Sequence, residues 1–176
     1  GQQSLVATSS DGLHFTSGQE NFGPSYFRVF QWGGYYYALG MPGMFFRSQD
    51  GFTNFELGPI LFDSKMRHAA VLITGHTLNV FYTVAESAPE HIVVSKIDLS
   101  VDWLSWQATN PIAVLYPELG YEGANLPIMP SARGAIHEPA HQLRDPGIFV
   151  EEDRTYLLYS IAGERGIAIA ELLTII

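Results

Sequence analysis

The residues best suited to chemistry form the triplet Arg144-Asp145-Pro146, which begins an apolar segment near the end of the chain. A carboxylate can act as a general acid or base, and a guanidinium offers a planar set of hydrogen-bond donors. Pro146 fixes the backbone where the strand begins and so directs Asp145 to one side. The triplet is therefore a candidate site. The alternative is a structural role, in which Asp145 binds Arg144 or nearby backbone amides.

A second group of polar residues lies in a Pro- and Gly-rich segment that precedes the triplet. Glu122 and Asn125, with Tyr121 beside them, combine planar polar groups with an aromatic face, as sugar recognition requires. The alternative is that Glu122 and Asn125 bind the backbone of their own loop. Glu138 is a further acid of this segment that could reach the site of Asp145.

The sequence HEPAH, residues 137–141, has the His-Glu-x-x-His spacing of zinc proteases. That spacing brings two histidines to one metal only on a helix. Pro139 stands at its centre, where proline costs a helix ~3 kcal/mol. A protease is therefore excluded, and we expect no bound metal and no cofactor. His137 and His141 remain candidate ligand-binding residues, with a non-helical metal site that adds Asp145 as the alternative.

Two segments that resemble each other indicate which elements position these residues. LVATSSDGLHF begins at Leu5 and MFFRSQDGFTNF begins at Met44, and each carries Ser-x-Asp-Gly after an extended apolar stretch. Asp-Gly is a strong turn signal, because glycine accepts the positive φ of a tight turn. The two turns lie 39 residues apart, which is in the range of propeller-blade repeats.

Three further segments align with one another as hairpins that end in a Tyr-rich strand. They span residues 26–40, 68–85 and 145–162, with turns at 33–34, 75–76 and 152–153. An apolar third strand follows each. The alignment places Tyr26, His68 and Asp145 at one position of the repeat, and Arg67 and Arg144 at the position before it.

The repeats predict an all-β chain that forms part of a β-propeller, about three to three and a half blades. Residues 1–16 end one blade, 24–58 and 66–108 form two blades, and 143–176 form the last. Residues 110–141 have no strand pattern and predict a long loop over one face. A β-sandwich is the alternative. Because an incomplete ring exposes strand edges, we expect either a piece of a longer protein or a homodimer that buries the open blade edges.

The composition restricts the classes of partner. Hydrophobic residues make up 47% of the 176 residues and charged residues 15%, which indicates a folded chain. The net charge of −9 argues against a nucleic-acid partner. No apolar run reaches the ~18 residues of a membrane span, so no membrane partner is expected. No signal peptide is recognisable and there is no cysteine, and the localisation stays open between cytoplasm and bacterial secretion.

The segment LRDPGIFVEEDRTYLLYS with the following GIAIAEL resembles a blade of the five-bladed propellers of glycoside hydrolase families 32 and 43. YEGANLPIMPS resembles part of an uncharacterised bacterial branch of such proteins. The resemblance implies carbohydrate as the ligand and three carboxylates supplied by three blades. In the family-32 pattern the Asp of Arg-Asp-Pro is the supporting carboxylate, a role that falls on Asp145. The matching residues of the other blades, His68 and Tyr26, are not acids, so Glu122 or Glu138 would have to complete the pair that hydrolysis needs.

We therefore predict a glycoside hydrolase-like protein that acts on or binds a carbohydrate in an axial cavity. Arg67, His68, Arg144 and Asp145 would line this cavity, and the loop 110–141 would cover it. The alternative is a propeller without hydrolase activity, which binds a saccharide or serves as an assembly module.

Overall fold

The computed structural model describes residues 2–18 and 23–173, and within them all regular structure is β-strand except for two single turns of 3-10 helix. The strands are β1 (Gln3–Ser4), β2 (Ala7–Thr8), β3 (Thr16–Ser17), β4 (Gly23–Pro24), β5 (Arg28–Trp32), β6 (Tyr35–Gly40), β7 (Met44–Ser48), β8 (Glu56–Ile60), β9 (Met66–Thr74), β10 (Thr77–Val84), β11 (Ile92–Asp98), β12 (Ile112–Leu115), β13 (Arg144–Glu151), β14 (Arg154–Ile161) and β15 (Gly166–Glu171). The 3-10 turns are η1 (Trp103–Ser105) and η2 (Gly120–Glu122). The all-β class predicted from the sequence is confirmed.

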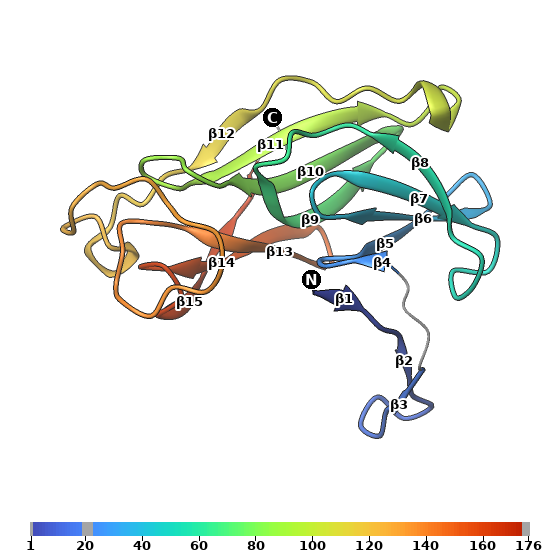
Figure 1. Ribbon diagram of the computed structural model, residues 1–176, viewed down its shortest axis with the longest axis horizontal. Helices are drawn as coiled ribbons and strands as arrows, with labels where there is room; N and C mark the ends of the chain where they lie inside the picture. Colours follow the sequence, from blue (N-terminus) through green and yellow to red (C-terminus); the bar gives the residue numbers. More distant parts are fainter. Residues whose placement is uncertain (1, 19–22, 174–176) are drawn as a thin grey trace.

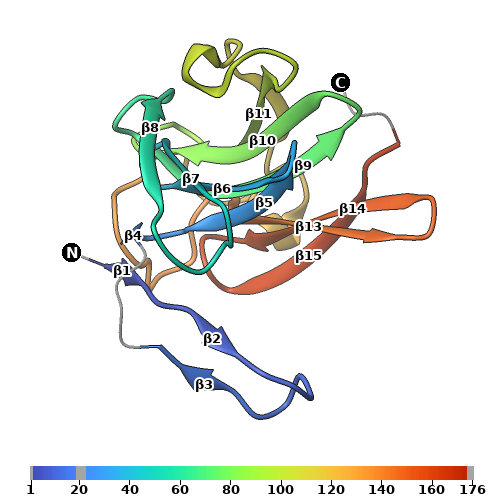
Figure 2. The same ribbon diagram turned by 90° about the vertical axis from the view of Figure 1, so that its right-hand side faces the viewer.

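Three antiparallel sheets of consecutive strands make up the body of the molecule (Figures 1 and 2). Two are four-stranded, β5-β6-β7-β8 and β9-β10-β11-β12, and the third contains β13-β14-β15. Each strand pairs with the next strand in the chain, so each sheet is a meander, as in a propeller blade. Two small sheets, β1-β4 and β2-β3, complete the described structure.

The hairpins form where the sequence predicts them, because the turn residues accept the backbone conformation that a two-residue turn needs. Gly33 and Gly34 connect β5 to β6 with φ of 55° and 82°. Positive φ at both central residues belongs to the turn whose twist matches that of the strands. These glycines therefore fix the register in which Phe30 pairs with Tyr37.

Two hydrophobic cores hold the three blades together. The first lies between β5–β8 and β9–β12 and contains Phe30, Phe45 and Val80, together with Trp103 and Trp106 from the region of η1. The second lies between β9–β12 and β13–β15. Each core consists of the facing sides of two neighbouring sheets, so every blade depends on its neighbours to bury its apolar side chains.

The prediction that residues 110–141 lack a strand is wrong at one point. Ile112–Leu115 form β12, which pairs with β11 through Val93 and Ala113 and completes the blade begun at β9. A run of four apolar residues after Pro111 is too short to give a periodic signal, and the exposed edge of β11 supplies the missing hydrogen bonds. The long loop thus begins after Leu115, and η2 is its one regular element within the part of the chain that the structure describes.

The N-terminal segment, predicted as the end of a preceding blade, contains the short hairpin β2-β3. This hairpin points away from the three blades (Figures 1 and 2). Strand β1 pairs with β4 next to the blade β5–β8. Among the described residues, no helix has both the length and the apolar character that crossing a membrane requires.

Candidate functional site

A cavity of about 510 Å³ opens where the inner strands of the three blades begin. We call it the axial cavity. It is lined by Gln2, Tyr26, Met41, Arg67, His68, Arg133, Gly134, Ala135, Asp145, Ser160 and Glu164. The lining is dominated by polar groups that can donate or accept hydrogen bonds, as hydroxyl-rich ligands require.

Tyr26, His68 and Asp145 share one backbone conformation, although they belong to three different blades. Their φ angles are 56°, 57° and 47°, in the left-handed region that residues other than glycine seldom occupy. The conformation costs each residue about 1–3 kcal/mol, and such strain is concentrated at functional sites. The position that the repeats align in the sequence is thus a distinct structural position.

A β-bulge produces this conformation in the last two blades. Arg67 pairs with Thr83 but Ala70 pairs with Phe81, so two residues of β9 lie opposite one residue of β10. In the same way Arg144 pairs with Ser160 and Gly147 pairs with Leu158. A bulge redirects the side chain at the extra residue, which here is His68 in one blade and Asp145 in the other.

A hydroxyl group on the neighbouring strand, paired with the arginine before each bulge, binds the redirected side chain. Thr83 Oγ1 lies 2.9 Å from His68 Nδ1, and Ser160 Oγ donates to Asp145 Oδ2 at 3.2 Å. Thr83 and Ser160 occupy equivalent places on the second strands of their blades. The same scaffold therefore presents an imidazole in one blade and a carboxylate in the next.

Tyr26 and His68 both approach the Asp145 carboxylate. The Tyr26 hydroxyl donates to Oδ1 at 3.0 Å, and His68 Nε2 lies 3.7 Å from the same oxygen. The rings of Tyr26 and His68 are 5.2 Å apart. Asp145 remains partly exposed to the cavity, so its carboxylate is both oriented by its neighbours and open to a ligand.

A buried ionic cluster supports the strands that carry His68 and Asp145. Arg67 donates to both oxygens of Glu90, from Nε at 2.9 Å and from Nη2 at 2.5 Å. Arg144 Nε lies 3.3 Å from Glu90 Oε2, and the Gln142 side-chain oxygen accepts two hydrogen bonds from Arg144. Since Arg67 and Arg144 directly precede His68 and Asp145, the cluster fixes the two strands at their bulges.

Glu164 is the second carboxylate of the axial cavity. It lies in the turn between β14 and β15, is partly exposed and forms an ion pair with Arg144 Nη1 at 2.9 Å. Sequence reasoning missed it, although a signal was available. The turn between the second and third strands of a blade lies at the same end as the start of the first strand, which places Glu164 beside Asp145.

Burial determines the protonation of two cavity residues. It lowers the pKa of His68 to about 4, against the opposing effect of the Asp145 carboxylate and with a further lowering by Arg67. Burial also raises the pKa of Tyr26 to about 12, and the Asp145 carboxylate adds to this shift. Near neutral pH the imidazole of His68 is therefore uncharged and the phenol of Tyr26 holds its proton, in agreement with its hydrogen bond to Asp145.

The loop residues predicted for the site lie outside the cavity lining. Glu122 is buried, where it accepts a hydrogen bond from the Tyr159 hydroxyl at 2.8 Å and two from the backbone amides of Glu118 and Leu119 at 2.9 Å. Its carboxylate thus organises the loop. Tyr121 and Asn125 are exposed, and neither lines the axial cavity.

The HEPAH residues are likewise not gathered around the cavity. Glu138 is exposed and lies 3.9 Å from Arg165, whose guanidinium also donates to the backbone oxygen of His137. Both ring nitrogens of His141 face backbone oxygens, those of Leu126 at 3.1 Å and Pro117 at 2.9 Å. Within residues 2–18 and 23–173, no three His, Asp or Glu side chains come together as a metal site, so the alternative metal site with Asp145 is not assembled.

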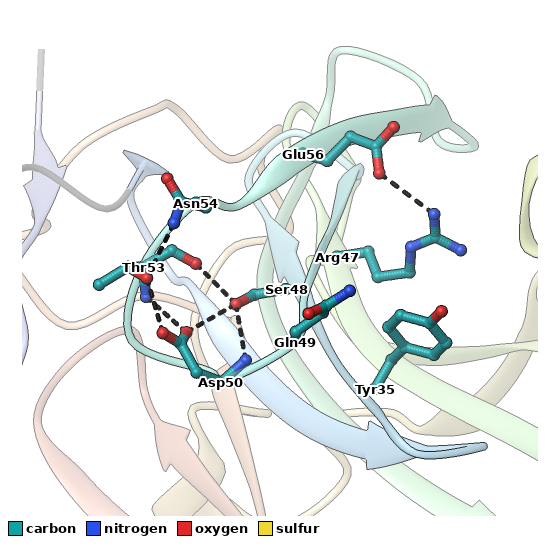
Figure 3. Close-up of a pocket in the computed structure, with 8 residues that line it drawn as sticks. All are labelled: Tyr35, Arg47, Ser48, Gln49, Asp50, Thr53, Asn54 and Glu56. Carbon is teal, nitrogen blue, oxygen red and sulfur yellow. Dashed lines mark hydrogen bonds and ion pairs between the residues drawn. The ribbon is translucent and has the colours of Figure 1, made fainter.

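A second hollow, of about 390 Å³, lies beside the turn Ser48-Gln49-Asp50-Gly51 on the blade β5–β8 (Figure 3). Asp50 Oδ1 accepts hydrogen bonds from the backbone amides of Phe52 and Thr53, and its Oδ2 accepts one from the Thr53 hydroxyl. These bonds hold the pKa of Asp50 well below its usual range. The polar groups of the turn are satisfied within the turn, so we assign it a structural role.

Comparison with known proteins gives one relative in sequence. The chain is 36% identical over 186 residues to the uncharacterized protein R118 of Acanthamoeba polyphaga mimivirus, in an alignment that covers 96% of this chain and 52% of R118. The chain thus spans about half the length of the curated relative it matches. No protein-family model matches the chain.

Two solved structures show the fold. A thermostable family-43 glycoside hydrolase superimposes with a TM-score of 0.60 and 17% identity, over 84% of this chain and 50% of that chain. The β-1,2-mannobiose phosphorylase of Listeria innocua superimposes with a TM-score of 0.53 and 13% identity, over 95% of this chain and 65% of that chain. The chain therefore has the fold of part of a five-bladed propeller, as the sequence predicts. The role that the family-32 pattern implies for Asp145 stays a prediction.

Proposed function

We propose that the axial cavity binds a saccharide and that Asp145 and Glu164 act there on a glycosidic bond. The observation that supports this most is that two partly exposed carboxylates line one polar cavity. Enzymes that cleave glycosidic bonds work with a pair of carboxylates on either side of the bond. The similarity in fold to a glycoside hydrolase and a disaccharide phosphorylase points to the same class of ligand.

The contacts of the two acids suggest different roles. Asp145 is oriented by hydroxyl donors from Tyr26 and Ser160, and a fixed direction suits a base or nucleophile that must address one atom. Glu164 is the remaining carboxylate and is assigned to protonate the leaving oxygen. Its ion pair with Arg144 would have to loosen when the substrate binds, so that the acid can carry a proton.

A second candidate is saccharide binding without catalysis. The observation in its favour is the ion pair of Glu164 with Arg144, a side chain that is itself buried. If this pair persists with ligand bound, Glu164 is a structural carboxylate and the cavity holds a single available acid. Both candidates place the sugar in the same cavity, and they differ only in turnover.

The test measures binding and turnover on the same protein. The probes are a panel of 4-nitrophenyl glycosides and β-1,2-mannobiose, each with and without inorganic phosphate, so that hydrolysis and phosphorolysis are distinguished. The variants are Asp145→Asn and Glu164→Gln, and Glu138→Gln is the matched control because Glu138 is exposed and lies outside the cavity. Loss of an acid or base lowers turnover by about 10²–10⁴-fold.

Turnover by the wild type that falls in both cavity variants, and persists in the control, supports catalysis. Calorimetric binding of a probe that Asp145→Asn weakens, without turnover, supports the second candidate. Absence of both binding and turnover over the whole panel at millimolar concentrations overturns the proposal. Equal activity of Asp145→Asn and the wild type does so as well.

A further inference from the structure

The axial cavity contains a charged residue that the proposed mechanism does not use. Arg133 lines the cavity from the loop between β12 and β13, and it is exposed. Its guanidinium carries five N–H donors. Among the described residues it donates one hydrogen bond, from Nη2 to the backbone oxygen of Ser64, and it forms no ion pair. Most of its donors are therefore available to a ligand in the cavity.

The other ionised groups of the lining, apart from Asp145, are paired inside the protein. Arg67 donates to both oxygens of the buried Glu90. Glu164 forms an ion pair with Arg144 at 2.9 Å. A close pair of opposite charges exerts little net force on a third charge, because attraction and repulsion nearly cancel. These pairs therefore contribute little to the charge that a ligand meets.

Asp145 and Arg133 are the two lining residues whose charge stays unpaired within the described part of the chain. The Asp145 carboxylate accepts hydrogen bonds from the hydroxyl groups of Tyr26 and Ser160, which are neutral. His68 lies near the same carboxylate but is uncharged at neutral pH, because burial lowers its pKa. Before a ligand binds, the cavity thus presents one negative and one positive group.

The backbone on both sides of Arg133 is held in place. Arg144 donates from Nη1 to the backbone oxygen of Gly134 at 3.1 Å and from Nη2 to that of Ala132 at 3.4 Å. The amide of the buried Ser131 donates to a backbone oxygen of the turn that follows β10, at 3.0 Å. The loop therefore keeps the guanidinium of Arg133 at the cavity before a ligand arrives, which reduces the entropy lost on binding.

We propose that the saccharide bound in the axial cavity is acidic and that Arg133 binds its carboxylate. The inference rests on the proposed binding of a saccharide in this cavity. A guanidinium donates two parallel hydrogen bonds to an oxyanion such as a carboxylate or a phosphate. A phosphate group carries a charge of about −1.5 to −2, whereas one unpaired guanidinium matches the single charge of a carboxylate. The ligand class that fits is therefore a uronide, a glycoside of a sugar acid.

The experiment measures the affinity of matched probes by calorimetry. The pairs are the 4-nitrophenyl glucuronide and glucoside, galacturonide and galactoside, and mannuronide and mannoside, and inorganic phosphate is a separate ligand. The variants are Arg133→Gln and Arg133→Lys. Arg165→Gln is the matched control, because Arg165 is also an exposed arginine that donates to a backbone oxygen but lies outside the cavity lining. Circular dichroism checks that each variant keeps its strands.

We expect the wild type to bind at least one uronide about 10-fold or more tightly than its neutral partner, as hydrogen bonds to a charged group allow. Arg133→Gln should abolish this preference. Arg133→Lys should restore part of it, because lysine keeps the charge but cannot form two parallel hydrogen bonds. Arg165→Gln should retain the preference of the wild type.

Equal affinity of the wild type for the two members of every pair overturns the inference and leaves the proposed function standing, because neutral glycosides then still bind. A preference that persists in Arg133→Gln, or that Arg165→Gln also removes, overturns it as well. So does binding of inorganic phosphate that depends on Arg133 without a preference for any uronide, since the site then takes a free anion. If no glycoside of either kind binds, the proposed function fails together with the inference.

Discussion

The buried carboxylate of Glu90 offers the strongest test of how the site is supported. Glu90 is fully buried and binds Arg67 through two hydrogen bonds, while Arg144 Nε lies 3.3 Å away. The substitution Glu90→Gln keeps the shape of the side chain and removes its charge. Two buried guanidinium groups then lose the carboxylate between them.

The size of the effect depends on which guanidinium is left unpaired. Arg144 keeps the Glu164 carboxylate at 2.9 Å, whereas Glu90 is the carboxylate to which Arg67 is paired. Removing one partner of a buried ion pair costs about 3–5 kcal/mol. Because one of the two arginines retains a partner, we expect a loss of about 3 kcal/mol in the free energy of unfolding. For a chain of this length that corresponds to a fall in Tm of about 6–12 °C.

The assay is urea denaturation followed by tryptophan fluorescence, since Trp103 and Trp106 are buried in the first core. The control is Glu56→Gln, which removes an exposed partner of Arg47 and should cost no more than about 1 kcal/mol. The double variant Arg67→Met/Glu90→Met should recover much of the loss, because an apolar pair of similar volume leaves no charge unpaired. A Glu90→Gln protein that is within about 1 kcal/mol of the wild type would refute the idea that this cluster holds the bulges in place.

Three further predictions concern single groups. The folded-state pKa of His68 is lowered to about 4, below its unfolded value near 6.5, so the unfolded chain binds more protons between these pH values. The free energy of unfolding should therefore fall as the pH drops from about 6.5 to about 4. In urea titrations at several pH values, His68→Gln should flatten this slope. Gly58→Ala would place a Cβ 2.1 Å from Cζ3 of Trp103. This overpacking should lower the free energy of unfolding by about 1–3 kcal/mol. Thermal denaturation measures it, and an unchanged Tm would contradict the close packing of Gly58 on Trp103. Tyr159→Phe removes the hydroxyl that donates to the buried Glu122. We expect the free energy of unfolding, measured by urea denaturation, to fall by about 1–3 kcal/mol. An unchanged free energy of unfolding would show that the backbone amides alone satisfy the Glu122 carboxylate.

The sequence was sufficient for those features that depend on local strand and turn chemistry. The spacing of the three hairpins and their turns predicted that Tyr26, His68 and Asp145 are equivalent, and the structure places Tyr26 and His68 against the Asp145 carboxylate. The pairing of strands within a blade follows from turn length, so this equivalence could be read without knowing how the blades pack. Arg67 and Arg144 could be aligned on the same grounds.

The sequence was not sufficient for residues whose position depends on the path of a loop. Glu122 and Glu138 have the chemistry of catalytic acids, but one is buried beneath Tyr159 and the other is exposed beside Arg165. No periodic pattern restricts a loop, so the direction of its side chains cannot be derived from spacing. Glu164 shows the opposite case, because its turn belongs to a blade and its place at the cavity follows from strand order.

The position before or at the start of each inner strand, occupied by Tyr26, His68 and Asp145, supplies the cavity with polar groups, and none of the three side chains belongs to a core between the blades. In β9 and β13 the residue at the bulge has no partner in the ladder, while the residues on either side of the bulge remain paired. We therefore expect a change of side chain at this position to leave the register and the cores between the blades unaltered. Phenol, imidazole and carboxylate groups occupy it in the three successive blades of this chain. For His68 and Asp145, the cost of the left-handed backbone is met by the strand pairing on both sides of the bulge and by the ion cluster around Glu90. It follows that the polar groups presented to the cavity can change by substitution at this position alone, provided that the arginines before His68 and Asp145 keep their carboxylate.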